Sequence, residues 1–313
     1  MKAIILNNYG TPDTLQLQDV PVPQINDDQV LVKIYAASIN PIEWKIASGG
    51  MKQVFPTNFP WIPGSDFAGT VETVGKNVSS FKAGDEVYGN VAMGGGYAGY
   101  VAASPQVIAK KPNVLSFTEA ASVPVVAQTA WQALFTHANL KEGQTILIHG
   151  AAGAVGGYAI QFARNAGAKV IATASGEDRE FVLSIGAEKA IDYKNARFED
   201  EAGKVDVVID LVGGDVQQRS YAVLKEGGHL VATTQPVSAD EAAKHKVTAF
   251  FMNMQPSAAG LEHIATLLDA GKLKTDVATI YPLADAAKAW QELMPNKTAG
   301  KKNKHGKAVL QVV

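Results

Sequence analysis

The stretch that decides the fold is His149-Gly150-Ala151-Ala152-Gly153-Ala154-Val155-Gly156. It ends a short apolar run, Thr145 to His149, that is typical of a buried strand. Apolar residues then recur at helical spacing, at Val155, Ala159, Phe162, Ala163 and Ala166. Gly167 stands where a helix would end in a left-handed residue. The sequence therefore predicts a strand, a glycine-rich turn and a helix in direct succession.

This is the context in which a glycine-rich turn binds the pyrophosphate of a dinucleotide. Against the pattern G-x-G-x-x-G, Ala151 replaces the first Gly, Gly153 lets the backbone approach the phosphates, and Gly156 permits close packing of helix on strand. The alternative is a turn that only connects two packed elements, which the strand and helix around it make the weaker interpretation. We expect the cofactor to contact Gly150, Ala151, Ala152, Gly153, Ala154, Val155 and Gly156.

The choice of cofactor depends on the residues after the next strand, where an acidic side chain would favour NADH. The chain here runs Thr173-Ala174-Ser175-Gly176-Glu177-Asp178-Arg179. Ser175 offers a hydroxyl and Arg179 a charged fork that suits a phosphomonoester, so we predict NADPH. Glu177 and Asp178 argue against this, and Arg179 paired with either of them on an exposed helix is the alternative.

Outside this stretch, the chain contains two regions that differ in their hydrophobic pattern. Apolar runs such as Lys169 to Thr173 and Val205 to Leu211 alternate with helical segments, as in a parallel sheet covered on both faces. From Lys2 to Pro112 short β-rich runs are separated by turn residues, and β character returns after Thr275. We predict an α/β protein with a β domain at 1–123 and 270–313 and a doubly wound Rossmann domain at 124–269.

Composition limits the kinds of ligand. The net charge of -2 gives no broad positive field for nucleic acid or anionic lipid, and no apolar stretch approaches membrane-spanning length. We therefore expect a cytoplasmic protein with no nucleic-acid or membrane partner. The chain has no Cys, which excludes disulfides, a thiol nucleophile and thiolate zinc sites. The basic run from Lys297 to Lys307 is interpreted as a solvated loop.

Several further motifs occur in order along the chain. They are Ala36-Ala37-Ser38-Ile39-Asn40-Pro41-Ile42-Glu43-Trp44-Lys45, Pro63-Gly64-Ser65-Asp66-Phe67-Ala68-Gly69, Gly75-Lys76-Asn77-Val78, and Phe81-Lys82-Ala83-Gly84-Asp85-Glu86-Val87. With the loop at 150–156, they make the chain resemble the zinc-free quinone oxidoreductases of the medium-chain dehydrogenase/reductase superfamily, close to its zeta-crystallin-like and enone-reductase members, along nearly its whole length.

The resemblance implies a GroES-like β domain, a Rossmann domain inserted into it, the nicotinamide in the cleft, and a homodimer or homotetramer. Zinc-dependent alcohol dehydrogenases of the same superfamily carry Cys where Asn40 stands and Gly-His-Glu where Gly64-Ser65-Asp66 stands. Neither Asn40 nor Ser65 is a zinc ligand, and the six His show no paired helical spacing. We therefore predict no metal site.

The resemblance also implies residues near NADPH beyond the glycine loop. They are Asn40 and Thr129 beside the nicotinamide, Ser175, Arg179 and Tyr193 around the adenosine phosphate, and Leu211, Val212, Thr233 and Thr234 in strand-end loops. Each has a purely structural alternative. Tyr193 could cap a strand, Thr129 could bond its own helix, and Asn40 before Pro41 could form a turn.

The predicted reaction is hydride transfer from NADPH to a quinone or α,β-unsaturated carbonyl without zinc. The candidate catalytic residues are Asn40, to orient the carboxamide or substrate, and Lys45, to stabilise the developing oxyanion; a surface Lys45 is the alternative. Two other functions stay open. One is an enoyl thioester reductase, which would favour a Tyr acid near Asn40, and none lies between Ser38 and Phe55. The other is an NADPH-binding sensor or structural protein with little turnover.

Overall fold

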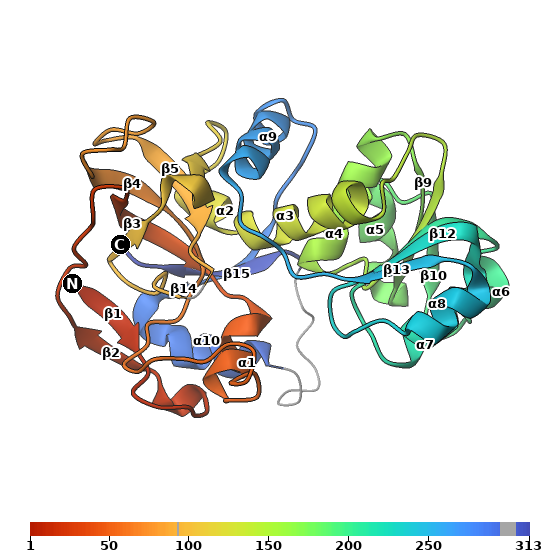
Figure 1. Cartoon of the computed structure of the whole chain (residues 1–313), viewed down its shortest axis with the longest axis horizontal. Helices are drawn as coiled ribbons and strands as arrows, with labels where there is room; N and C mark the ends of the chain where they lie inside the picture. Colours follow the sequence, from red (N-terminus) through yellow and green to blue (C-terminus); the bar gives the residue numbers. More distant parts are fainter. Residues whose placement is uncertain (93, 295–304) are drawn as a thin grey trace. The chain divides into compact units, whose positions relative to one another are not determined.

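The computed structural model describes residues 1–92, 94–294 and 305–313. Contacts within the chain divide it into two units, which are described separately here (Figure 1). The first unit comprises Met1–Val125 and Pro256–Val313, and the second comprises Val126–Gln255. The chain thus leaves the first unit once and returns to it.

The second unit is built on a six-stranded parallel sheet in the order β10-β9-β8-β11-β12-β13. The strands are β8 (Thr145–His149), β9 (Lys169–Ala174), β10 (Lys189–Asp192), β11 (Val205–Asp210), β12 (Leu224–Ala232) and β13 (Thr248–Phe251). The chain builds the sheet outward from β8 to β10, then crosses back to β11 and continues to β13. The order therefore reverses between β8 and β11, which makes this the switch point where ligands bind in open α/β sheets.

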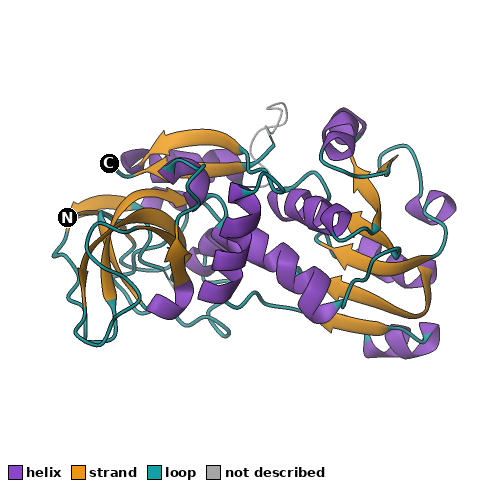
Figure 2. Ribbon diagram, turned by 90° about the horizontal axis from the view of Figure 1, so that it is seen from above, coloured by secondary structure: helices purple, strands orange, loops and turns teal. Residues whose placement is uncertain are grey.

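Helices lie on both sides of this sheet (Figure 2). They are α4 (Ala154–Asn165), α5 (Arg179–Ser184), α6 (Phe198–Glu201), α7 (Asp215–Ser220) and α8 (Ala239–His245). The central strands β8 and β11 are buried along most of their length because both faces are covered; in β8, Ile146, Leu147 and Ile148 are fully buried. The predicted doubly wound sheet is what the structure contains, and β8 has the bounds that the apolar run predicted.

The first unit contains a seven-stranded sheet, mostly antiparallel, in the order β14-β15-β3-β4-β5-β7, with β6 pairing β3. Its strands are β3 (Val30–Ser38), β4 (Asp66–Val74), β5 (Glu86–Asn90), β6 (Tyr100–Ala103), β7 (Ile108–Lys110), β14 (Val277–Pro282) and β15 (Lys307–Gln311). A separate ribbon joins β1 (Lys2–Ile5) to β2 (Gln16–Asp19). Strand β15 pairs antiparallel with β3, so the last strand of the chain lies beside a strand from its first forty residues.

Helices of the first unit are α1 (Pro41–Ala47), α2 (Phe117–Ala121), α9 (Ala258–Asp269) and α10 (Ala286–Leu293), and α3 (Pro124–Trp131) contains the boundary with the second unit. Helix α9 falls within the Rossmann domain that the sequence predicts at 124–269. The structure groups it with the first unit, where it packs against β7 and its Leu261 carbonyl accepts a hydrogen bond of 2.6 Å from Tyr88. A helix that ends one domain in sequence can pack on the next, and periodicity does not distinguish the two.

The basic run from Lys297 to Lys307 needs a correction. Residues up to Lys304, including Lys301 and Lys302, lie outside the described part of the chain. Lys307 begins β15 and is only 7% exposed, so the expectation of a solvated loop is wrong for this residue.

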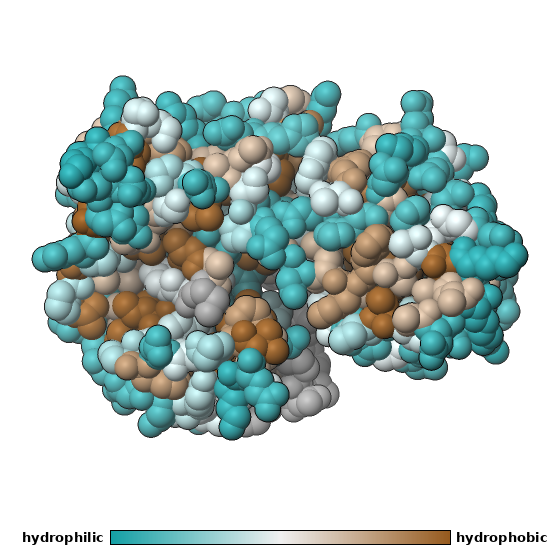
Figure 3. Space-filling model, viewed as in Figure 1, coloured by the Kyte–Doolittle hydropathy of each residue, from teal (hydrophilic) through white to brown (hydrophobic). Residues whose placement is uncertain are grey.

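The surface carries few large apolar side chains among hydrophilic ones, and in the view of Figure 3 hydrophobic residues form small patches. Phe250 and Phe251 of β13 are 37% and 40% exposed. Among the described residues, no helix has the length and apolar character needed to cross a membrane.

Candidate functional site

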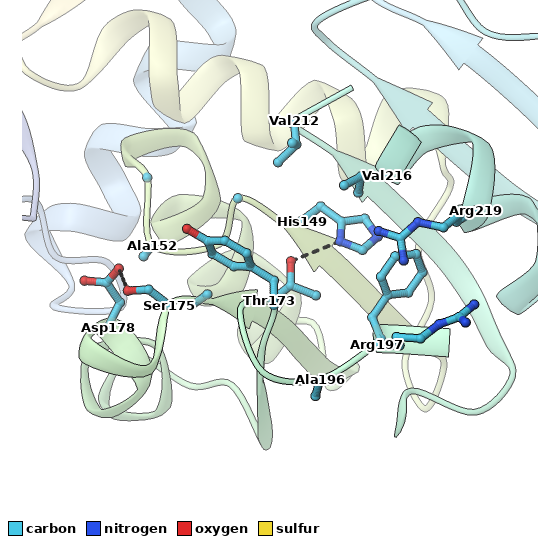
Figure 4. A pocket seen from close by; sticks show the side chains of 15 residues that line it. His149, Ala152, Thr173, Ser175, Asp178, Ala196, Arg197, Val212, Val216 and Arg219 are labelled. Atoms are coloured by element: carbon cyan, nitrogen blue, oxygen red, sulfur yellow. Dashed lines mark hydrogen bonds between the residues drawn. The ribbon is translucent and has the colours of Figure 1, made fainter. Parts of the chain in front are cut away.

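A pocket of about 530 Å³ opens beside the glycine-rich turn of the second unit (Figure 4). We call it the glycine-loop pocket. Its lining residues come from the ends of β8 and β9, from the loops after β10 and β11, and from α6 and α7: His149, Gly150, Ala152, Gly153, Thr173, Ala174, Ser175, Asp178, Tyr193, Ala196, Arg197, Phe198, Val212, Val216 and Arg219. It therefore lies at the carboxyl ends of strands next to the switch point.

The turn between β8 and α4 needs glycine at two positions for different reasons. Gly150 has a φ of 69°, which favours glycine. A Cβ on Gly156 would lie 2.5 Å from the Gly150 carbonyl oxygen and 2.6 Å from Ala151 Cα, so a side chain there would collide with backbone. This close approach agrees with the packing role predicted for Gly156. It brings the first turn of α4, with N–H groups that lack intrahelical partners, next to the pocket.

His149 lies at the base of the pocket and is held in one tautomer. Its Nε2 lies 3.1 Å from the hydroxyl oxygen of Ser220, and that hydroxyl donates its proton to the Val216 carbonyl at 2.7 Å. Nε2 therefore carries the imidazole proton and donates to Ser220. Nδ1 then accepts from the hydroxyl of Thr173 at 3.0 Å. Because that proton is used, the Thr173 oxygen can only accept hydrogen bonds from a ligand in the pocket.

Burial keeps this histidine neutral. His149 is 1% exposed, and desolvation lowers its pKa from 6.5 to about 4. The nearby charge of Asp210 opposes the shift and that of Arg219 adds to it, while Glu199 also opposes it. The imidazole acts here as a fixed neutral hydrogen-bonding group at ordinary pH.

The residues predicted around the adenosine phosphate are only partly together. Ser175 and Tyr193 line the pocket, and Tyr193 is 60% exposed. The Ser175 hydroxyl donates to Asp178 at 2.6 Å, so an acidic side chain stands beside it. Arg179 does not line the pocket, and its Nη1 donates to the Ala190 carbonyl at 3.1 Å. The alternative for Arg179, an ion pair with Glu177 or Asp178, is not among the ion pairs of the described residues.

The other predicted cofactor residues occupy strand ends of the second unit. Val212 lines the pocket and is 51% exposed, and its N–H donates to Asp210 at 2.9 Å. Leu211 precedes it after β11. Thr233 and Thr234 follow β12, and the Thr233 N–H donates to the Asp210 carbonyl at 3.1 Å. Thr129 is buried in α3 and does not line this pocket.

Sequence reasoning missed the far wall of the pocket. Arg197 and Phe198 come from the start of α6, and Arg219 from the end of α7. The Arg219 guanidinium lies 4.8 Å from the centre of the Phe198 ring and pairs with Glu199 at 2.9 Å. No motif marks these positions, because they meet only when two separate helices pack beside β8.

A second polar centre lies in the first unit around Asn40, which is 2% exposed. We call Asn40, Glu43, Asp66 and Lys307 the Asn40 cluster. Asn40 caps α1 just after β3, with Pro41 as the first helical residue. Asp66 begins β4, which pairs with β3, and Lys307 begins β15, which pairs with the other side of the same end of β3. Two strand pairings and one helix start thus bring four polar residues together.

Hydrogen bonds fix the amide of Asn40 in one orientation. Its Nδ2 donates to Asp66 at 3.1 Å and to Glu43 at 3.3 Å, so both amide hydrogens are used. Its Oδ1 accepts from the Lys307 ammonium, which also donates to the Ile39 carbonyl at 2.6 Å. A flipped amide would turn its NH2 group toward the ammonium and its oxygen toward the carboxylates, so this orientation is excluded. Any further hydrogen bond to the Asn40 side chain must therefore be made by a donor to Oδ1.

The two carboxylates are buried and surrounded by donors. Asp66 also accepts from Ser38 at 3.0 Å and from Asn90 at 2.8 Å. Burial raises the pKa of Asp66, and the Lys307 charge opposes this. Burial likewise raises the pKa of Glu43, against hydrogen bonds from the Asn40 N–H and from Tyr97. Burial lowers the pKa of Lys307, and the charges of Asp66 and Glu43 oppose it. Burial of these charged groups is thus opposed by the charges of the other members and, at Glu43, first by hydrogen bonds.

A tyrosine does reach this segment, from a distant part of the chain. The Tyr97 hydroxyl donates to Glu43 and accepts from the Trp290 Nε1–H at 3.3 Å. Tyr97 is fully buried, and burial followed by the Glu43 charge raises its pKa well above the ordinary value. Its proton is therefore held inside the protein. Lys45 lies on the exposed side of α1 and is not a hydrogen-bond partner of Asn40.

The donor set does not fit a catalytic zinc ion. Zinc takes Cys, His and carboxylate ligands in tetrahedral geometry, whereas this cluster holds a carboxamide and a buried ammonium that would repel a cation. Among the described residues, no group of three or more His, Cys, Asp or Glu is arranged to hold a metal.

Comparisons with known proteins agree with both units. Residues 26–113 match the alcohol dehydrogenase GroES-like domain, and residues 185–302 match the zinc-binding dehydrogenase family. The chain is 35% identical to the chloroplast envelope quinone oxidoreductase homolog of Arabidopsis thaliana, over 96% of this chain and 97% of the relative. It is also 35% identical to the chloroplastic NADPH-dependent alkenal/one oxidoreductase of the same plant, over 96% of this chain and 78% of that protein.

The quinone oxidoreductase structure from Coxiella burnetii has a TM-score of 0.91 and 36% identity, and the match covers 100% of this chain and 99% of that one. These matches confirm the predicted GroES-like and Rossmann fold. The predicted reaction class also agrees with the activities for which these relatives are named. The chain therefore belongs to the quinone oxidoreductases of the medium-chain dehydrogenase/reductase superfamily.

Proposed function

We propose that this protein is an NADPH-dependent oxidoreductase that transfers a hydride to a quinone or an α,β-unsaturated carbonyl without zinc. The observation that carries the proposal is the glycine-loop pocket at the switch point of the parallel sheet. Relatives of this chain are named for NADPH-dependent alkenal/one and quinone reduction. Bound NADPH supplies the hydride, and the residues of the chain hold the reactants in place.

The residues present fit the dinucleotide. The pocket is lined by Gly150, Ala152 and Gly153, so phosphates bound in it would lie beside the N–H groups at the start of α4. Val212, Val216 and Phe198 provide apolar surface for a base, and the Thr173 oxygen accepts from a hydroxyl or amino group. Leu211, Thr233 and Thr234 remain proposed contacts from strand-end loops, and Thr129 remains proposed beside the nicotinamide.

We propose that Arg197 is one of the cationic side chains that bind the extra phosphate of NADPH. Ser175 and Tyr193 line the pocket together with Arg197, whereas Arg179 does not. Arg197 is also exposed, with 70% of its side chain accessible, and it pairs with Glu199 at 3.3 Å. Arg179 stays a candidate that would need to turn away from the Ala190 carbonyl.

Asn40 is proposed to orient the reacting groups as an acceptor. Since both hydrogens of Nδ2 are donated to Glu43 and Asp66, the group that it can hold is a donor such as a carboxamide N–H. It is therefore not a donor to a developing oxyanion. A quinone or enone is already electrophilic, so correct placement lowers the barrier without a dedicated acid in the protein. Lys45 remains a proposed oxyanion contact that its exposed position does not favour.

The test is NADPH consumption with a panel of quinones, enones and an enoyl thioester, with NADH and a metal chelator as controls. The proposal predicts chelator-resistant turnover with quinones or enones and a preference for NADPH. Tight NADPH binding without turnover would favour a sensor or structural protein. Turnover confined to the thioester would favour an enoyl reductase, and chelator-sensitive alcohol oxidation would overturn the metal-free mechanism.

We also propose a homodimer, or a homotetramer built from it, that uses the outer edge of β13. This strand pairs with β12 on one side, ends the order of the sheet, and carries the exposed Phe250 and Phe251. Light scattering of the wild type and of Phe251→Glu tests it, because a monomeric wild type would contradict the proposal. The cytoplasmic location stays a prediction, since some relatives are described as chloroplastic, and cell fractionation would decide it.

A further inference from the structure

Lys307 is buried, and its ammonium contacts the Asn40 amide. It lies in a fully buried environment with Asp66 and Glu43, and its two hydrogen bonds go to Asn40 Oδ1 and to the Ile39 carbonyl. A buried lysine side chain costs desolvation and entropy, and neither hydrogen bond is required by the fold, because β15 and β3 are already paired through their backbones. Its polar end therefore serves the Asn40 cluster.

Without this cation the cluster would not hold Asn40 in its present orientation. Asp66 and Glu43 both accept from Nδ2, which fixes one end of the amide, and Lys307 donates to Oδ1 at the other end. Removing the ammonium would also leave two buried carboxylates facing each other with no opposing charge. Their repulsion would then be relieved by proton uptake or by water entry, and either one frees the amide to rotate.

The Lys307 ammonium holds two acceptors at the end of β3, the Asn40 Oδ1 and the Ile39 carbonyl. We infer that Lys307 is a positioning residue: it supplies a fixed positive charge that holds the Asn40 amide with one Oδ1 position turned to a donor. This inference rests on the proposed role of Asn40 in hydride transfer.

The chain offers a matched control for its test. Lys111 belongs to the same unit, its side chain is 7% exposed, and it donates to the carbonyls of Pro112 and Leu115. It pairs with Glu86 and touches no member of the Asn40 cluster. Lys111→Met therefore removes a largely buried ammonium and keeps the stem, as Lys307→Met does, but leaves Asn40 untouched.

The first readout is kinetic. In single-turnover reactions with NADPH and the best quinone or enone, Lys307→Met should lower the rate about 100-fold, the size of effect that a misplaced orienting group causes, while the dissociation constant of NADPH changes less than about threefold. In an Asn40→Ala background, Lys307→Met should have no further effect, because it acts through Asn40. Lys111→Met should leave the rate within about threefold of wild type.

The second readout needs no activity. The side-chain amide protons of Asn40, identified in NMR spectra by their absence from Asn40→Ala, should exchange slowly with water in the wild type. They should exchange fast in Lys307→Met and stay slow in Lys111→Met. If Lys307→Met does not fold, Lys307→Arg keeps the charge but moves the donors, and should still speed the exchange and slow hydride transfer.

The outcomes separate this inference from the proposed function. A wild type without turnover removes the proposed function and leaves the NMR comparison to decide the role of Lys307. If the wild type is active, unchanged rate and unchanged amide exchange in folded Lys307→Met or Lys307→Arg overturn the inference. Losses in Asn40→Ala and Lys307→Met that multiply would also overturn it, since Lys307 would then act independently of Asn40.

Discussion

The two polar centres of this protein are built on opposite principles. The glycine-loop pocket is open, about 530 Å³ in volume, and lined by mostly neutral or apolar groups. The Asn40 cluster is buried and charged, and the Asn40 amide is held by hydrogen bonds to Glu43, Asp66 and Lys307. A binding site must leave groups unsatisfied until the ligand arrives, whereas an orienting group must be fixed before the ligand arrives. The difference predicts that substitutions in the pocket change affinity and that substitutions in the cluster change rate.

The largest effect is expected at Asn40. Asn40→Ala should lower the single-turnover rate of hydride transfer about 100- to 1,000-fold, because the orienting acceptor is lost, and should change NADPH affinity less than about threefold. Stopped-flow absorbance and cofactor fluorescence measure the two quantities. A normal rate, or a loss confined to affinity, would break the division between the two centres.

The next effect concerns His149 and stability. Its folded pKa of about 4 lies below the ordinary value of 6.5, so between these values the unfolded chain binds a proton that the folded protein excludes. Stability therefore rises with pH across this window and is level above it. In the wild type, the free energy of unfolding should fall between pH 7 and pH 4, and His149 should account for about 3 kcal/mol of that fall. His149→Gln should therefore lose less stability over this range by the same amount. Denaturant titrations measure this difference.

A control for this effect is His229→Gln, which alters a half-buried histidine in β12 outside the pocket. This variant leaves the hydrogen bonds of His149 to Thr173 and Ser220 in place. If His149→Gln shows the same pH dependence as wild type, His149 is not the neutral, desolvated group that the hydrogen bonds to Thr173 and Ser220 describe.

Substitution at the glycine turn should affect binding. Gly156→Ala would place a Cβ 2.5 Å from the Gly150 carbonyl, so the turn must shift and the NADPH dissociation constant should rise about 30-fold. Gly157→Ala is the matched control, because its Cβ would meet only Ile185 at 3.7 Å. Calorimetric titration with NADPH compares them, and equal affinities of the two variants would contradict the role given to the turn.

A smaller effect separates the two arginines. Arg197→Ala should weaken NADPH binding about tenfold and leave NADH binding nearly unchanged, since one charge-assisted contact to a phosphate is lost. Arg179→Ala should have less effect, because Arg179 does not line the pocket. The reverse order would return the phosphate contact to Arg179 as the sequence suggested.

The smallest effect is expected at Lys45. It is exposed on α1, so Lys45→Met should leave turnover within about twofold of wild type. A loss of tenfold or more, with the fold intact, would instead support Lys45 as an oxyanion contact. Steady-state rates with the best substrate decide between the two.

The parts that could be predicted are those that local sequence determines. The strand β8, the glycine turn and α4 follow one another within a short stretch, and their hydrophobic period and glycine positions define them. The cofactor residues at strand ends, by contrast, were implied by the family resemblance, and they stay predictions.

The parts that could not be predicted depend on long-range pairing. Lys307 contacts Asn40 across 267 positions of the chain, through the pairing of β15 with β3. Lys307 lies in a basic, glycine-containing run, and nothing in the neighbouring sequence predicts that its side chain is buried. Tyr97 was likewise missed as a neighbour of the Asn40 segment because only residues close in sequence were considered. Arg197 and Arg219 reach the pocket from helices that no motif connects.

The decisive measurement follows deuterium from the cofactor into an enone. NADPH carrying deuterium on the transferred position of its nicotinamide is oxidised by the enzyme in the presence of the enone, and the product is analysed by mass spectrometry. Hydride transfer predicts one deuterium on the carbon at the far end of the reduced double bond, with the same label, formed more slowly, in Asn40→Ala. Cofactor oxidation that leaves the product unlabelled, or no reduction of any enone or quinone, would contradict the account.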